Sequence, residues 1–109
     1  MKQTVNLYEF RDAFNKVRPD NFSYDGLEVL FNYCEEYEES TGEDFPIDGL
    51  DVIHFCCEFN EMTPQEIIKS YNLDVADDGN ELNNVIDCLY DMTNVCGKTP
   101  QGTIVFQQF

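Results

Sequence analysis

Carboxylates dominate the chemistry that this chain can offer. Its 109 residues include 22 Asp and Glu against 6 Lys and Arg, for a formal net charge of −16 at pH 7. Residues three or four apart on a helix lie about 5–6 Å apart, so a helix would arrange such side chains in rows. We therefore predict a partner-binding acidic face in the densest stretch, formed by Glu28, Glu35, Glu36, Glu39, Glu43 and Asp44.

The net charge decides which partners are compatible. Nucleic acid and anionic membranes are polyanions, so this chain is expected to bind neither of them directly. Duplex DNA carries about one charge per 1.7 Å of its axis, so a charge of −16 corresponds to roughly 27 Å of duplex. Such a surface fits a basic DNA-binding groove, so a DNA mimic that occupies the basic surface of a nucleic-acid-binding protein is one interpretation of the charge.

A second interpretation of the charge stays open. The carboxylates of a structural or regulatory protein can serve solubility alone, while the protein associates through an apolar patch or dimerises. Ionic strength separates the two hypotheses, because binding by a mimic weakens steeply with salt and apolar association does not.

Histidine and cysteine raise the possibility of a metal site. His54, Cys56 and Cys57 lie close together in the sequence. The remaining thiols are Cys34, Cys88 and Cys96. In a strand, His54 and Cys56 would share one face while Cys57 points to the other, and the chain has no Cys-x-x-Cys pair. We predict no metal site and no cofactor.

A calcium loop and an enzyme active site are also disfavoured. The segment 74–80 resembles a calcium-binding loop, but Ala76 and Val85 stand where its third and twelfth positions need oxygen ligands. The single histidine has no recognisable nucleophile motif, and no glycine-rich phosphate loop is present. The expected function is non-enzymatic.

The odd number of cysteines bears on where the protein resides. Five thiols with these spacings match no disulfide framework, and the chain has neither a signal peptide nor an apolar run near eighteen residues. We predict a cytoplasmic protein with reduced, buried thiols.

The acidic run is expected to lie on a helix that begins after Ser23 and ends at Gly42. An apolar stripe along this helix comprises Leu27, Leu30, Phe31 and Cys34. Glu36 and Glu39 would lie near its C-terminal end, where the helix dipole disfavours anions. Because the C-terminal end of a helix favours cations, carboxylates at this end suggest a use in binding.

Residues 52–59 alternate in a way that predicts a strand. Ile53, Phe55, Cys57 and Phe59 would form one apolar face. We expect the first three of these to be buried under the apolar stripe of the acidic helix.

Three more helices and two more strands complete the expected fold. Asn6 with Glu9, and Thr63 with Glu66, are capping boxes that begin two of the helices, and the last helix covers about 81–92. Strands are predicted at 93–96 and 103–109. The order α-α-β-α-α-β-β predicts one acidic α+β domain over 1–109: a small antiparallel sheet of about three strands, covered on one face by about four helices.

Four segments of the chain resemble a family of short acidic proteins encoded by phages and prophages. These segments are YEFRDAF, FSYDGLEVLFNYCEEYEESTG, LDVIHFCCEF and the terminal GTIVFQQF. The resemblance covers 8–59 and the last strand. It implies a mobile-element origin and a setting in the host cytoplasm, and it carries over no catalytic or ligand residues. Small acidic phage proteins often inhibit host nucleic-acid-binding machinery, including restriction and CRISPR systems, so the implied role is inhibition of such a defence system.

Overall fold

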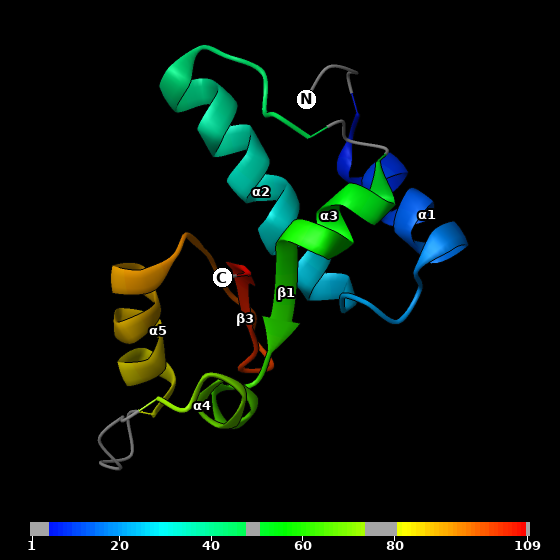
Figure 1. Cartoon of the computed structure of the whole chain (residues 1–109). Coiled ribbons are helices and arrows are strands. Elements are labelled where there is room, and N and C mark those ends of the chain that lie inside the picture. Colours follow the sequence, from blue (N-terminus) through cyan, green and yellow to red (C-terminus); the bar gives the residue numbers. More distant parts are fainter. Residues whose placement is uncertain (1–4, 48–50, 74–80, 109) are drawn as a thin grey trace.

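The computed structural model describes residues 5–47, 51–73 and 81–108 (Figure 1). The described elements are α1 (Leu7–Val17), α2 (Tyr24–Thr41), α3 (Val52–Glu58), β1 (Phe59–Met62), α4 (Pro64–Tyr71), α5 (Glu81–Met92), β2 (Val95–Lys98) and β3 (Ile104–Gln107). The predicted class is confirmed: this is an α+β fold with a small three-stranded antiparallel sheet.

Local capping chemistry begins and ends the helices where the sequence predicts. Asn6 and Thr63 each form a capping box with the glutamate three residues later. Ser23 is the N-cap of α2, where its hydroxyl accepts from the Gly26 amide at 3.0 Å. Gly42 ends α2 at a φ of 72°, a left-handed conformation that glycine adopts without steric penalty.

Strand β3 is the centre of the sheet, whose strand order is β1-β3-β2. Met62 of β1 pairs with Ile104, and Val95 of β2 pairs with Phe106. Ile104, Val105 and Phe106 are all completely buried. Successive strand residues point to opposite faces, so both faces of β3 must be covered.

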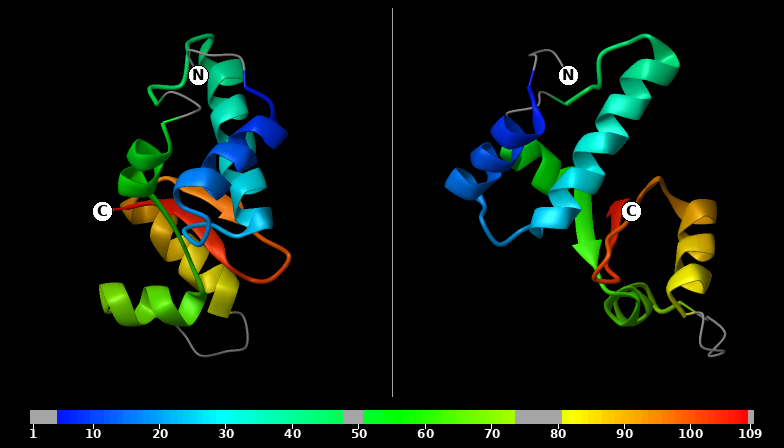
Figure 2. Two further views of the ribbon diagram at one scale, coloured as in Figure 1. Left: turned by 90° about the vertical axis from the view of Figure 1, so that its right-hand side faces the viewer. Right: turned by 180° about the vertical axis from the view of Figure 1, so that it is seen from behind.

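Two hydrophobic cores supply that cover, which corrects the predicted single covered face. Val105 belongs to a core built mainly from α1, α2 and α3, whereas Ile104 and Phe106 belong to a core with side chains of α4 and α5. The sheet lies between these two groups of helices (Figures 1 and 2). The run of three apolar residues in β3 is the sequence signal for a strand buried on both faces.

The predicted strand at 52–59 is wrong, because residues Val52–Glu58 form helix α3. The Asp51 side chain accepts from the His54 amide at 3.2 Å and so caps this helix. Phe55 is buried as expected, but Ile53 is 45 % exposed and Cys57 is exposed. A helical period places Val52 and Phe55 on the core side, and the chain becomes extended only at β1.

Smaller differences concern the second half of the chain and the helical stripe. The described chain holds five helices, and β2 begins at Val95 and ends at Lys98, two residues later than predicted. In the stripe of α2, Leu27, Leu30 and Cys34 are buried while Phe31 is only half-buried.

Candidate partner-binding site

Helix α2 gathers four of the six predicted carboxylates on one side. At 3.6 residues per turn, Glu35 and Glu39 lie within about 20° of Glu28 around the helix axis, and Glu36 lies about 80° away. Glu28 and Glu39 are separated by about 16 Å along the axis. All four are exposed. Glu35, Glu36 and Glu39 form one cluster and Glu28 lies two turns before it, with Asn32 between them. These four glutamates are called here the acidic face.

Glu43 and Asp44 lie just beyond the C-terminal end of α2, and both are exposed. Their segment is held to the helix, because the Phe45 amide donates to Glu38 Oε2 at 2.9 Å and the Glu43 amide donates to Thr41 Oγ1 at 3.2 Å. The buried Phe45 ring fixes this segment to the core. The structure therefore brings four predicted residues together and places the other two past the helix end.

Only one of the six carboxylates forms an ion pair with another described residue. Arg11 Nη2 lies 3.5 Å from Glu28 Oε2. The same guanidinium donates from Nη2 and Nε to the Tyr24 carbonyl at 2.8 and 3.2 Å and lies 3.4 Å from the centroid of the Tyr24 ring. Glu28 is thus tied to α1, whereas no ion pair to Glu35 or Glu39 exists within the described ranges.

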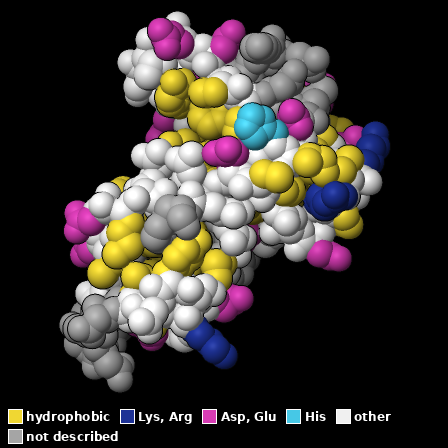
Figure 3. All heavy atoms as spheres, in the orientation of Figure 1, with side chains coloured by type: hydrophobic (Ala, Val, Ile, Leu, Met, Phe, Trp, Pro, Cys, Tyr) yellow, Lys and Arg dark blue, Asp and Glu magenta, His cyan; other side chains and the backbone are white. Residues whose placement is uncertain are grey.

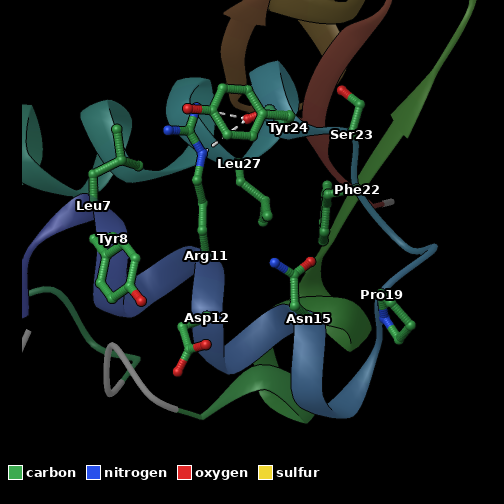
Figure 4. Close-up of a pocket in the computed structure, with 10 residues that line it drawn as sticks. All are labelled: Leu7, Tyr8, Arg11, Asp12, Asn15, Pro19, Phe22, Ser23, Tyr24 and Leu27. Atoms are coloured by element: carbon green, nitrogen blue, oxygen red, sulfur yellow. Dashed lines mark hydrogen bonds between the residues drawn. The ribbon is translucent and has the colours of Figure 1, made fainter.

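A groove of about 690 Å³ lies between α1 and the start of α2 (Figure 4). Arg11 crosses it from α1 to the ring and carbonyl of Tyr24. Tyr8 and Tyr24, at 77 % and 71 % exposure, are the two open aromatic side chains on its lining. A cation of the chain itself, Arg11, already stacks on the Tyr24 ring of this groove and pairs with Glu28 on α2.

Glu61 is a positioning residue that the sequence reasoning missed. Its carboxylate, on β1, accepts hydrogen bonds from the Ser23 amide and hydroxyl, both at 2.7 Å, and from Thr103 Oγ1 at 2.5 Å. A Cβ atom on Gly26 would clash with the Glu61 carboxylate. Glu61 therefore attaches the first turn of α2, and with it the acidic face, to the sheet. The glycine in that first turn is the one sequence signal of this close approach.

The histidine and the thiols are spread rather than clustered. His54 lies 4.0 Å from Asp51 and 3.9 Å from Glu58. No group of three or more His, Cys, Asp or Glu suited to a metal ion occurs among the described residues. The prediction of buried thiols is correct for Cys34 and wrong for Cys57, which is exposed. The calcium-like segment 74–80 lies outside the described residues.

Burial alters the chemistry of two thiols. Loss of hydration raises the pKa of Cys34 from its ordinary value of 9.0 to about 12, and burial also raises the pKa of Cys96 strongly. Neither thiol is expected to act as a nucleophile, because the thiolate is the reactive form.

No family model, curated protein sequence or solved structure matches the chain. Among the described residues, no helix combines the length and apolar character that crossing a bilayer requires. The chemistry of the site therefore carries the functional argument.

Proposed function

We propose that this protein is a non-enzymatic binding protein whose acidic face occupies a basic surface on a partner protein. The observation that carries the proposal is the exposure of Glu35, Glu36 and Glu39 without a cation beside them among the described residues. Glu39 also lies in the last turn of α2, where the helix dipole disfavours anions. A basic partner supplies a countercharge that the described residues do not.

The partner is a host protein that binds nucleic acid, and the acidic face replaces phosphates in its basic groove. Long carboxylates in helical rows about 5–6 Å apart approximate successive phosphates of one DNA strand. The resemblance to short acidic phage and prophage proteins supports the same class of target, a nucleic-acid-binding defence system of the host cytoplasm. DNA and the protein then compete for one groove.

The test begins with a triple variant, Glu35→Gln, Glu36→Gln and Glu39→Gln. The partner is captured from host lysate at two salt concentrations, identified by mass spectrometry and purified, and its affinity for both forms is measured. Exposed ion pairs contribute roughly 0.2–1 kcal/mol each, so removal of three weakens binding by about tenfold and flattens its salt dependence.

A matched control carries the same change in net charge at exposed sites away from the acidic face: Asp20→Asn, Asp87→Asn and Asp91→Asn. It should bind the partner within about twofold of wild type. Labelled duplex should be displaced from the partner by wild type and by the control. Simultaneous binding of duplex and protein, or equal losses in the two triple variants, contradicts the mimic.

An apolar association surface is the second candidate, and the exposed rings of Tyr8 and Tyr24 favour it. They flank the groove between α1 and α2. Association through them would persist at high salt and would be lost in Tyr8→Ser with Tyr24→Ser, while the triple Gln variant would still associate. Light scattering at low and high salt separates this candidate from the first.

A further inference from the structure

A second hollow, of about 320 Å³, lies between α2, α3 and the sheet. Four aromatic side chains line it, namely Tyr33, Tyr37, Phe45 and Phe59. The rings of Tyr33 and Tyr37 each meet Phe45 edge to face, with centroids 6.0 and 5.2 Å apart. In Figure 3, hydrophobic side chains gather beside the single histidine on the face toward the viewer. We call this hollow the aromatic pocket.

One carboxylate is held in position at the aromatic pocket. Gln107 Nε2 donates to Glu58 Oε2 at 3.2 Å, and Asn94 Nδ2 donates to Gln107 Oε1 at 2.7 Å. His54 Nε2 lies 3.9 Å from the other carboxylate oxygen. The Glu58 side chain is still 43 % exposed, so a ligand can reach it.

The chemistry of the lining selects a cation. Aromatic rings present negative faces, Glu58 adds a negative charge, and no Lys or Arg is among the residues that line the pocket. An anionic ligand would meet this carboxylate and a chain of net charge −16. A guanidinium fits best among protein cations, because it is planar, stacks on rings and binds carboxylates through two parallel hydrogen bonds.

We propose that the aromatic pocket binds an arginine side chain of the basic partner, with its guanidinium against the tyrosine rings and hydrogen-bonded to Glu58. The identity of the partner rests on the proposed function. The chain already uses this combination once within itself, since Arg11 stacks on Tyr24 and pairs with Glu28.

Helix α2 contributes to both the aromatic pocket and the acidic face, on different sides. Tyr33 and Tyr37 lie about 140° and 180° around the helix axis from Glu28, and Glu36, about 60° from Tyr33, lies between the two surfaces. A basic partner that contacts Glu36 reaches the pocket by extending around the helix. Insertion of an arginine makes binding depend on the planar shape of the guanidinium, whereas the acidic face selects a partner only by its positive charge.

The binding test uses a single blocked amino acid and needs no host protein. N-acetyl-arginine N-methylamide is titrated into the full chain, and the aromatic and amide NMR resonances are followed. Shifts are expected at Tyr33, Tyr37 and His54, not at Tyr8 or Tyr24. The corresponding citrulline compound, neutral and of the same shape, should bind at least fivefold more weakly, and the lysine compound should also bind more weakly.

Two variants and a control test the assigned groups. Glu58→Gln keeps the shape of the side chain and should weaken binding of the arginine compound at least fivefold. Tyr37→Leu should do the same through loss of the ring face. Glu35→Gln removes the same charge outside the pocket and should change binding by less than twofold, and thermal melts establish that each variant folds.

The proposal is overturned if citrulline binds as well as arginine, if Glu58→Gln and Glu35→Gln weaken binding equally, or if the shifts fall on Tyr8 and Tyr24. These outcomes are independent of the acidic face. The triple Gln variant of that face should still bind the arginine compound. Loss of partner binding in the triple variant, together with no shift on arginine addition, would support the acidic face and reject the pocket.

Discussion

Glu61 is the residue through which the acidic helix is attached to the sheet. Its carboxylate accepts from three donors, two on Ser23 and one on Thr103. Glu61→Ala leaves these donors without their acceptor and should lower the free energy of unfolding by about 2–4 kcal/mol. Urea denaturation measures the change, with Glu35→Ala as a surface control expected to change it by less than about 0.5 kcal/mol.

Gly26 provides an independent check of the same contact. An added Cβ would displace the Glu61 carboxylate from its donors, so Gly26→Ala should destabilise the wild type. In the Glu61→Ala background the obstacle is gone, and the substitution should become neutral or stabilise by about 0.5–1 kcal/mol, as alanine ordinarily does in a helix. Additive effects in this double-mutant cycle would mean that the two residues do not meet.

Burial of Cys34 leads to a prediction about stability at high pH. Its pKa is raised to about 12, so above about pH 9 the unfolded chain releases a proton that the folded chain keeps. Stability from this group is complete below that pH and is lost as pH rises toward 12. Unfolding of wild type and Cys34→Ala is compared at pH 8 and pH 10, and the variant should lose less stability between them. An equal loss in both proteins would contradict the raised pKa.

At the scale of the element, α3 decides which side chains of 52–58 are buried. The Phe55 ring is completely buried, with ring centroids of Phe10 and Phe45 at 5.3 and 6.1 Å. Phe55→Ala should cost about 3–5 kcal/mol, whereas Ile53→Ala, on the exposed side, should cost less than about 1 kcal/mol. Chemical denaturation of the two variants distinguishes helix from strand, because a strand would bury both residues and make both substitutions costly.

The charge of α2 gives a second prediction at this scale. Glu35 and Glu39 lie four apart, a like-charge arrangement that is destabilising, and Glu39 in the last turn also opposes the helix dipole. The triple Gln variant of the acidic face should gain about 0.5–1.5 kcal/mol of stability at low salt, and the gain should shrink as salt is added. A variant that is less stable at every salt concentration would show that these carboxylates have stabilising contacts within the fold.

At the scale of the whole molecule, a net charge of −16 is carried on a body with extents of 43 × 30 × 22 Å. The screening length falls from about 30 Å at 0.01 M salt to about 8 Å at 0.15 M, so self-repulsion is strong only at low ionic strength. The melting temperature should therefore rise over this range of sodium chloride concentration. A melting temperature independent of salt would mean that the charges are already compensated within the fold.

Both helix layers depend on β3, the strand that forms from the last part of the described chain. Val105 joins the core with α1, α2 and α3, while Ile104 and Phe106 join the core with α4 and α5. This strand connects the acidic helix and the aromatic pocket to the rest of the molecule, since Gln107 also holds Glu58. Both proposed binding surfaces are therefore supported by β3, the strand that is buried on both faces.

The sequence by itself determined the features that depend on neighbours along the chain. Capping at Asn6, Ser23 and Thr63 and termination at Gly42 follow from hydrogen bonds and backbone conformations within a few residues. The 3.6-residue period likewise separates the exposed carboxylates of α2 from its buried stripe. For these reasons the acidic helix was predictable to its ends.

Only the tertiary structure decided the features that join distant segments. The segment 52–58 carries both a period-2 and a helical pattern, so the sequence alone does not choose between strand and helix. In the helix, the Phe55 ring packs against Phe10 of α1 and Phe45, which follows α2. Glu61 contacts a residue 38 positions earlier in the chain, and the aromatic pocket assembles side chains from α2, α3 and β3. Such contacts leave no local pattern, because their energy comes from packing between segments that become neighbours only when the chain folds.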